Sequence, residues 1–296
     1  MNEKSHRDTI FVDEAVILEQ VEYPGRQYIL SVHAPQCAEK ALPGSFAHIT
    51  CDPSLPMRRP LSIMSADPDS GEVRFLYKIV GEGLSLLAQK KPGDQVSVMG
   101  PIGKPFYPDN ERRRTLLIGG GVGIPPMIFL ADHLKKDTAT DWLPLVLMGS
   151  ELPFPFDITP SQLDAGDIPA TASHGLKLLE RQCVTSRLAS LAGLEGCFHG
   201  FVTELGRDWL LGLSDEERDE VAIFSCGPTP MLAAVAALAA EFNLPCQVSL
   251  EEFMACAVGG CAGCVVPTRT ANGVAMKRVC VDGPVFEAHT VFPPAA

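Results

Sequence analysis

The amino-acid sequence predicts a multidomain protein of the β plus α/β class, with a small cysteine-rich module at its C-terminus. Short runs rich in Val, Ile and Phe recur from residue 9 to residue 100, whereas strands alternate with helices across residues 108–246. The first pattern is typical of an antiparallel barrel or sandwich, and the second indicates a parallel sheet. An array of cysteines near the end marks the module. We therefore expect three units, over residues 1–107, 108–246 and 247–296.

Length and composition fit this organisation and exclude several classes of protein. The 296 residues, 46% of them hydrophobic, are enough to bury the cores of two domains. A net charge of −12 disfavours nucleic acid and anionic membranes as main partners. Ten cysteines and a charged N-terminus without a signal-peptide pattern favour a reducing cytoplasm. The uncharged run Thr115–Ala131 is interrupted by glycines and prolines, so we expect no membrane span there.

In the first unit, turn signals such as Pro-Gly pairs separate the apolar runs, and helical periodicity is weak. These signals delimit the strands that we expect, which cover residues 10–18, 27–33, 46–51, 61–66, 73–79 and 95–99. The segment Gly100–Phe106, with two glycines and two prolines, is expected to be a linker to the second unit.

Two short motifs in the first unit could bind a phosphorylated ligand. A guanidinium group binds phosphate oxygens through paired hydrogen bonds, and glycine lets main-chain amides approach the same oxygens. Alone, an Arg-Pro pair before a strand is more often part of a surface turn, so the motifs carry weight only together with the nucleotide signal that follows them. The candidate binding residues are Arg59, Pro60, Leu61, Ser62, Leu76, Tyr77, Lys78, Gly83 and Leu84.

The second unit opens with the pattern strand, glycine turn, helix. The apolar strand Arg114–Ile118 leads into a run of glycines and then into a helix that begins with proline, where a missing N–H costs least. Free amides and the helix dipole at such a turn favour the pyrophosphate of a dinucleotide. The motif Gly-x-Gly-x-x-Ile-Pro is not the full Rossmann fingerprint, so it is weak by itself. The candidate residues are Gly119, Gly120, Gly121, Gly123 and Pro125.

A later strand, Val221–Ser225, runs into Cys226, Gly227 and Pro228, and a helix follows that is expected to stop near Asn243. Alternation of strand and helix again indicates a parallel sheet. For Cys226, a buried structural thiol is about as common as a functional one, so the residue alone does not decide between the two.

The segment between these motifs is the hardest to interpret. A proline-rich insert is expected over about residues 151–195. Arg181 and Arg187 could contact an adenine-ribose phosphate, although solvated charges are the more common explanation. The spacing of His174, His199 and Glu204 is not that of metal ligands, and we assign them no metal.

Four cysteines near the C-terminus form the strongest motif. Cys256, Cys261 and Cys264 have the spacing Cys-x4-Cys-x2-Cys, and Cys280 follows, which is the plant-type ligand pattern of a [2Fe-2S] cluster. The glycines and alanines between them let the main chain wrap closely around a cluster and direct amides at its sulfurs. Zinc is the main alternative, but it usually takes two Cys-x2-Cys pairs. Four unrelated buried thiols remain the least favoured interpretation.

Taken together, these motifs resemble a known family. The Arg-Pro-Leu-Ser and Cys-Gly-Pro motifs resemble those of the ferredoxin reductase superfamily. The ending, with Ser-Leu-Glu-Glu from Ser249 and Arg-Val-Cys-Val-Asp-Gly-Pro-Val-Phe from Arg278, resembles the electron-transfer subunit of class B dihydroorotate dehydrogenases. The resemblance implies that Arg59 and Ser62 hold FAD, that the glycine turn holds NAD with Cys226 near the nicotinamide, and that the four cysteines bind a [2Fe-2S] cluster. Phe253 and Ala257 stand where the family often has arginine and glycine.

The resemblance also implies a function and a partner. Electrons would come from an FMN-containing dihydroorotate dehydrogenase catalytic subunit, pass through the cluster and FAD, and reach NAD⁺, as a step of pyrimidine biosynthesis. Two copies of each subunit would form a heterotetramer, with apolar residues around Ala257-Val258 and Val285-Phe286 at the interface. A stand-alone NAD(P)H-ferredoxin or flavin reductase is one alternative, and a zinc-stabilised nucleotide-binding module is another. The preference for NAD or NADP stays open.

Overall fold

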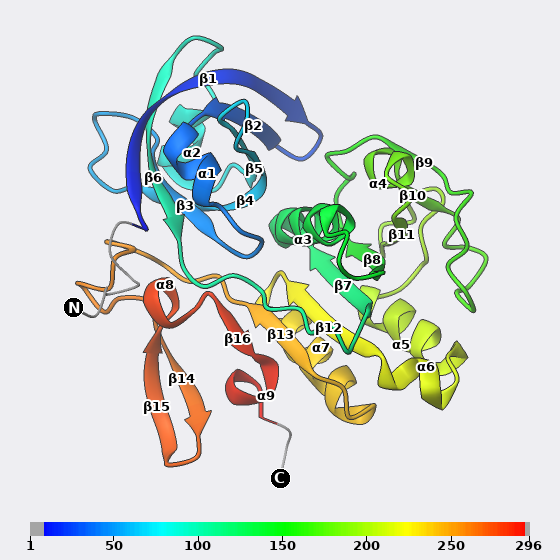
Figure 1. Cartoon of the computed structure of the whole chain (residues 1–296). Helices are drawn as coiled ribbons and strands as arrows, with labels where there is room; N and C mark the ends of the chain where they lie inside the picture. The colour runs from blue at the N-terminus through cyan, green and yellow to red at the C-terminus, as the bar shows by residue number, and fades with distance from the viewer. Residues whose placement is uncertain (1–8, 294–296) are drawn as a thin grey trace.

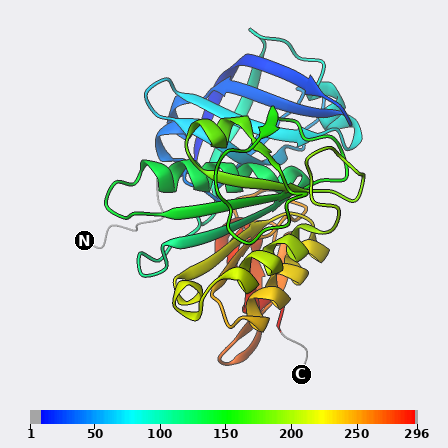
Figure 2. The ribbon, with the colours of Figure 1, turned by 90° about the vertical axis from the view of Figure 1, so that its right-hand side faces the viewer.

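The structure, a computed structural model, describes residues 9–293 of the chain. It contains a closed barrel, a six-stranded sheet with helices on both faces, and a C-terminal hairpin with a long preceding loop. Figure 1 shows the barrel in blue and cyan, most of the sheet in green and yellow with its last two strands in orange and red, and the C-terminal hairpin in orange. The turned view in Figure 2 places the sheet between the barrel and the hairpin.

The first unit was expected to be an antiparallel barrel or sandwich, and the structure shows that it is a closed barrel. Its strands close in the order β1-β2-β5-β4-β3-β6, with antiparallel neighbours. Gly100–Ile102 extends the last strand, so the prediction of a linker was wrong for these residues. The strands are β1 (Phe11–Tyr23), β2 (Gln27–His33), β3 (Phe46–Thr50), β4 (Arg59–Asp67), β5 (Glu72–Lys78) and β6 (Gln95–Ile102), with short helices α1 (Pro35–Lys40) and α2 (Gly81–Leu87).

The sheet of the second unit has the order β11-β8-β7-β12-β13-β16, and all its pairs are parallel except the last. Strand β13 crosses the boundary expected between residues 246 and 247. The strands are β7 (Arg114–Gly120), β8 (Leu143–Gly149), β11 (Thr185–Ala189), β12 (Val221–Cys226), β13 (Cys246–Ser249) and β16 (Val285–Glu287).

Side chains of the buried strands alternate between the two faces of this sheet, as the period of a strand requires. On one face, Leu117 packs in the core with α3 (Ile124–Lys136). On the other face, Leu116 and Ile118 pack in the core formed with α5 (Val202–Gly212) and α7 (Thr229–Glu241). Burial on both faces explains why these strands are continuous apolar runs in the sequence.

The insert contains structure that the sequence did not reveal. It forms a small two-stranded sheet of β9 (Ile158–Pro160) and β10 (His174–Leu176), then α4 (Lys177–Arg181) and the edge strand β11. Its first residues contact the barrel, because buried Gln27 donates from Nε2 to the carbonyl of Pro153 at 2.9 Å. The insert is therefore attached to both domains.

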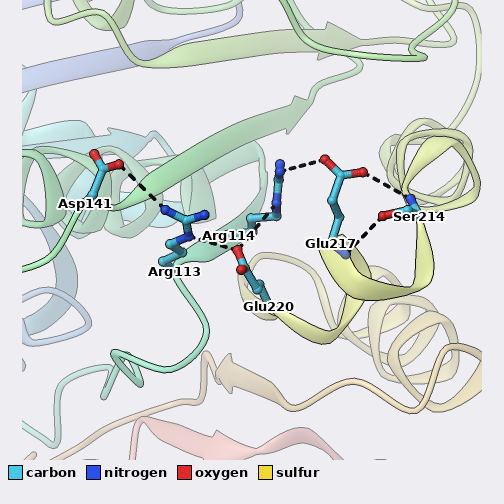
Figure 3. A network of polar contacts seen from close by, with 6 residues as sticks. All are labelled: Arg113, Arg114, Asp141, Ser214, Glu217 and Glu220. Carbon is cyan, nitrogen blue, oxygen red and sulfur yellow. Dashed lines mark hydrogen bonds and ion pairs between the residues drawn. The ribbon is translucent and has the colours of Figure 1, made fainter.

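A network of ion pairs lies at the start of β7, and Figure 3 shows it from close by. Arg113 Nε lies 2.9 Å from Glu220 Oε2, and Arg114 Nη2 lies 2.6 Å from Glu217 Oε1. Ser214 accepts from the Glu217 amide and begins α6 (Asp215–Asp219). Parallel sheets usually bind ligands at the carboxyl ends of their strands, and this network lies at the amino end, where it links the start of β7 to α6 and the residue after it.

The C-terminal module is joined to the sheet by β16, which pairs with β13. It consists of the hairpin β14 (Val265–Thr270) and β15 (Gly273–Arg278), with the one-turn helices α8 (Val279–Asp282) and α9 (Ala288–Val291). The loop before β14 carries three of the four cysteines and passes beneath the barrel in Figure 1. Among residues 9–293, none of the helices combines the length and the apolar character needed to cross a membrane.

Candidate functional site

The two phosphate-binding motifs of the barrel lie on neighbouring strands that separate from each other. The ladder between β4 and β5 ends at the pair Ile63 and Phe75. Beyond that pair, Arg59–Ser62 bond only to β3 and Leu76–Lys78 only to β2. The facing main-chain edges of the two motifs thus lie outside any ladder, where a flat ligand could use their hydrogen-bonding groups.

Arg59 lies beside the first turn of α2, where both motifs meet. A Cβ atom on Gly83 would lie 3.1 Å from the Arg59 guanidinium, so glycine gives this guanidinium its room. In the described chain, the guanidinium bonds to the protein through Nη1, to the carbonyls of Met57 and Arg58. Nε and Nη2 are left for phosphate oxygens, which suits the predicted role.

The other barrel candidates divide by the direction of their side chains. Tyr77 is 1% exposed, stacks on Tyr28 at 5.3 Å between ring centres and donates its hydroxyl to Gln20 Oε1. It can therefore contribute only its main chain to a ligand. Leu61, Leu76 and Leu84 are likewise buried, whereas Pro60, Ser62 and Lys78 retain accessible side chains.

The glycine turn has the geometry of a dinucleotide site. Gly119 and Gly120 end β7, and Gly121 and Gly123 form a 3-10 turn, η1, before α3, in which buried Pro125 occupies the first turn. Gly121 has φ +54°, and its Cβ position opens into free space.

The two nucleotide motifs, a hundred residues apart in sequence, touch each other. A Cβ atom on Gly123 would lie 2.4 Å from the main-chain carbonyl of Cys226, closer than any side chain tolerates. Gly227 has φ +157° and Pro228 leads into α7, so this second turn also depends on residue type. Strands β7 and β12 are neighbours, which brings the two turns together at one edge of the sheet.

Cys226 lies at this edge with two residues that the sequence reasoning left without a role. It is fully buried, opposite Ser249 in the ladder of β12 and β13. Burial, and next the Glu251 carboxylate, raise the pKa of the Cys226 thiol, so the thiol is protonated at neutral pH. Glu251 belongs to the Ser-Leu-Glu-Glu run, and its position after a strand beside the Cys-Gly-Pro turn is the signal that could have found it.

The barrel and the sheet meet beside these motifs. Helix α3 packs against β4, and its Phe129 lies in the barrel core. The turn η1 contacts β5, which carries Leu76–Lys78. A ligand on the β4–β5 edge and a ligand at the glycine turn would therefore be neighbours, as transfer of hydride between a flavin and a nicotinamide requires.

The four predicted cysteine ligands come together as two pairs. Cys264 Sγ and Cys280 Sγ are 3.4 Å apart, and the amide of Cys261 donates to Cys256 Sγ at 3.4 Å. Within residues 9–293, no group of three or more His, Cys, Asp or Glu side chains is arranged around a single metal ion. The Cys264–Cys280 pair and the neighbouring Cys256 and Cys261 offer four thiolates, which is the number that the two irons of a [2Fe-2S] cluster require.

The main chain of the cysteine loop is suited to a negatively charged cluster. The hydrogen bond from the Cys261 amide lowers the pKa of the Cys256 thiol to about 7, and the Gly263 amide donates to Cys261 Sγ. Arg278 fixes the loop by donating from Nη1 to the carbonyl of Gly259 at 3.0 Å. Amides that point at sulfur favour the thiolate, which is the form that binds iron.

The apolar residues that were expected at the interface with a catalytic subunit are only partly exposed. Ala257 is 1% exposed and Val285 is 8% exposed, so the prediction that they lie at an interface was wrong. Val258 is exposed as expected, and Phe286 is half-buried. The most exposed apolar side chain of the loop is Phe253, at 91%.

Arg187 of the insert and Glu204 of α5 make structural contacts. Arg187 is 8% exposed and donates to Ser161 Oγ and to the carbonyls of Ser186 and Leu163, so it is not available for a ribose phosphate. Glu204 accepts from the amide of Phe201 at the start of α5.

His48, to which the sequence reasoning assigned nothing, is a buried polar residue in the middle of β3. Burial, and next the charge of Arg58, lower the pKa of His48 to about 4, although the main chain of Met254 acts in the opposite direction. Its side chain is 1% exposed, so the neutral ring is the form that the folded chain accommodates.

This pKa predicts a loss of stability in acid. Because the unfolded chain takes up the proton near pH 6.5 and the folded chain only near pH 4, stability should fall as pH falls through this window. The contribution of His48 is about 3 kcal/mol. Urea unfolding of the wild type and of His48→Gln at pH 7 and pH 4.5 measures it, and the variant should lose less stability. Equal losses would mean that His48 is not the group that titrates.

The comparisons with known proteins agree with this geometry. A family model described as the iron-sulfur cluster binding domain of dihydroorotate dehydrogenase B matches residues 251–292. Among solved structures, an NADH-dependent reduced ferredoxin-NADP oxidoreductase is similar with a TM-score of 0.74 and 26% identity, covering 94% of this chain and 90% of that one. The ferredoxin reductase of carbazole 1,9a-dioxygenase shares the fold at a TM-score of 0.61 and 22% identity, over 80% of this chain and 67% of that one.

Three curated relatives share a single description, dihydroorotate dehydrogenase B (NAD(+)), electron transfer subunit. The protein of Desulforamulus reducens is 32% identical over 89% of this chain and 92% of its own length. The protein of Bacillus caldolyticus is 34% identical over 90% of this chain and 93% of its own length. That of Listeria welshimeri is 33% identical over 94% of this chain and 98% of its own length. At this identity over nearly the whole length, the chain belongs to the family of dihydroorotate dehydrogenase B (NAD(+)) electron transfer subunits.

Proposed function

We propose that this chain carries electrons from an FMN-containing dihydroorotate dehydrogenase catalytic subunit, through a [2Fe-2S] cluster and FAD, to NAD⁺ in pyrimidine biosynthesis. The observation that carries the proposal is the convergence of three motifs. The separated edge of β4 and β5, the glycine turn and the paired cysteines all lie where the barrel, the sheet and the C-terminal loop meet. A flavin supplies the link between single electrons and hydride, because it exchanges one electron with iron and two with nicotinamide.

We assign the residues as follows. The barrel motifs hold FAD, with Arg59 on its phosphates and Ser62 beside the ring system. The turns at Gly119–Gly123 and Gly227-Pro228 hold NAD, and buried Cys226 closes the nicotinamide pocket as a neutral thiol. The cluster ligands are Cys256, Cys261, Cys264 and Cys280. We keep three domains, which are the barrel, the nucleotide domain and the cluster module. The cluster module begins after β13 instead of at residue 247.

The cysteines also support a location in the cytoplasm. All ten are free in the structure, including the pair Cys264 and Cys280. Free thiols and thiolate-bound iron are maintained in a reducing compartment. We propose that the chain works there in a heterotetramer with two catalytic subunits.

Loss of the Arg59 guanidinium should release FAD. Arg59→Ala removes a charge-assisted contact to phosphate, which is worth roughly 1.5–3 kcal/mol, so FAD should bind about ten to a hundred times more weakly. The absorbance of protein-bound flavin after gel filtration measures retention. Arg74→Ala is the matched control, because Arg74 on β5 is paired with Glu72 and lies outside both motifs. A fully loaded Arg59→Ala protein would remove Arg59 from the proposed site.

A charge at the glycine turn should weaken the binding of NAD without loss of FAD. Aspartate tolerates the left-handed conformation of Gly121, whose Cβ position is open, so Gly121→Asp should fold. Its carboxylate would face the pyrophosphate, and the KM for NAD⁺ should rise about tenfold or more. Gly121→Asn has the same shape without the charge and should bind NAD⁺ more tightly than Gly121→Asp. Equal KM values for the two variants would place the pyrophosphate elsewhere.

A second candidate, a stand-alone reductase that exchanges electrons with ferredoxin, is favoured by one observation. The similar structure with 26% identity is that of a ferredoxin-NADP oxidoreductase. The isolated chain, supplied with NADH and soluble ferredoxin, distinguishes the two functions. Slow reduction of ferredoxin, compared with fast exchange in the complex with the catalytic subunit, is expected from our proposal, and the reverse would favour the reductase.

A further inference from the structure

His48 lies on the outer face of the barrel, between the proposed flavin strand and the loop of cluster ligands. Its neighbours Ala47 and Ile49 point into the barrel core, so His48 and Phe46 point outward. In the ladders, His48 is opposite Pro60 of β4 and Met99 of β6. It is thus directly beside the Arg-Pro-Leu-Ser motif.

The outer face of β3 is covered by the C-terminal loop. Phe46 lies in one apolar cluster with Met254, Cys264 and Cys280. The main chain of Met254, two residues before the first cysteine ligand, faces the His48 ring. His48 therefore lies between a strand assigned to FAD and a loop assigned to the cluster.

The ring of His48 is polar, buried and without a partner. Neither Nδ1 nor Nε2 has a hydrogen bond to any described residue, although the side chain is 1% exposed. Most buried polar groups in native proteins are paired, and an exception calls for a structural or functional reason. The Arg58 guanidinium is engaged elsewhere, because it donates to the carbonyls of His48 and Ser97, while the main chain of Arg58, like that of Met254, faces the His48 ring.

We propose that His48 is a positioning residue that ties the cluster loop to the flavin strand, through a hydrogen bond to the main chain of Met254 that closes when the cluster is bound. This hydrogen bond would join an unpaired ring nitrogen of His48 to the nearby main chain of Met254. The inference rests on the proposed function, since it needs both cofactors in one chain. His48 touches neither cofactor and acts through Met254, in the manner of the outer partners that orient metal ligands.

The test compares variants that differ in hydrogen bonding more than in size. His48→Leu removes both ring nitrogens, and His48→Gln keeps a donor and an acceptor near the position of Nε2. Phe46→Leu is the control for packing, because Phe46 shares the same outer face without a polar group. The measurement, on the chain purified with FAD and iron, is the rate of iron loss to a chelator, together with the electron paramagnetic resonance spectrum of the reduced protein.

His48→Leu should lose iron about tenfold faster than the wild type, which is the usual size of an outer-partner effect. FAD content should be unchanged, His48→Gln should restore most of the retention, and Phe46→Leu should not show the acceleration. Iron loss from His48→Leu at the wild-type rate would overturn the inference, as would equal acceleration in all three variants. A wild-type protein without iron would instead overturn the proposed function, so the two failures are distinguishable.

Discussion

Replacement of Cys280 by serine is expected to abolish the paramagnetic signal of the reduced cluster while FAD stays bound. Cys280 is 3% exposed, on α8, and its Sγ is 3.4 Å from that of Cys264. It is the only one of the four proposed ligands outside the loop, so it joins α8 to the loop at the site. Serine offers a hard, protonated oxygen where iron-sulfur clusters take soft thiolates.

The control for this replacement is a buried cysteine elsewhere in the same chain. Cys197 is 8% exposed and belongs to a different core cluster from that of Cys264 and Cys280. Cys197→Ser should keep the signal and the iron content. If Cys280→Ser kept the full signal, the fourth ligand would be a different residue, and the pairing of Cys264 with Cys280 would have no role in metal binding.

A charge at Phe253 is expected to separate the chain from its catalytic subunit. Phe253 is 91% exposed in the loop that bears the cysteines, and Val258 and Val281 beside the same loop are 51% and 39% exposed. A cluster that receives electrons from another chain must lie close to that chain. Buried aromatic residues dominate interfaces, so Phe253→Asp should weaken the complex by about 2 kcal/mol or more, or roughly thirtyfold.

The matched control for Phe253 is another exposed apolar side chain of the same module. Val274, 74% exposed, lies on the hairpin of β14 and β15, beyond the cysteine loop. Val274→Asp should bind the catalytic subunit as the wild type does, and both variants should retain iron and FAD. Titration calorimetry or analytical ultracentrifugation measures the affinity. Equal weakening by the two variants, or none by Phe253→Asp, would place the interface on another surface.

Much of the barrel could be predicted from the sequence because its strands are short and separated by glycine and proline turns. The predicted strand 27–33 coincides with β2 (Gln27–His33), where apolar residues lie between a Pro-Gly turn and Pro35. Strand β11 (Thr185–Ala189) escaped prediction because its interior holds Ser186 and Arg187. Their polar groups are paired with the insert, which a one-dimensional pattern does not reveal.

The individual motifs of the site could be predicted from the sequence, but the contacts between them could not. The contact of Gly123 with Cys226 depends on β7 and β12 being neighbours, which follows from the topology of the sheet. His48 belongs to no motif, and only folding places it beside the cluster loop. Glu251 belongs to the Ser-Leu-Glu-Glu run, but only folding places it beside Cys226. Ala257 has φ +55°, a conformation that glycine adopts without strain, so the glycine that the resemblance leads us to expect there would fit this main chain.

The most direct test of the central claim is reconstitution of the complete reaction. The catalytic subunit with FMN, dihydroorotate and NAD⁺ are combined with or without this chain loaded with iron and FAD, and formation of NADH is followed by absorbance. We predict that NADH forms only when both proteins are present, and that Cys280→Ser abolishes it. Formation of NADH without this chain, or undiminished formation with Cys280→Ser, would contradict the proposed path of electrons.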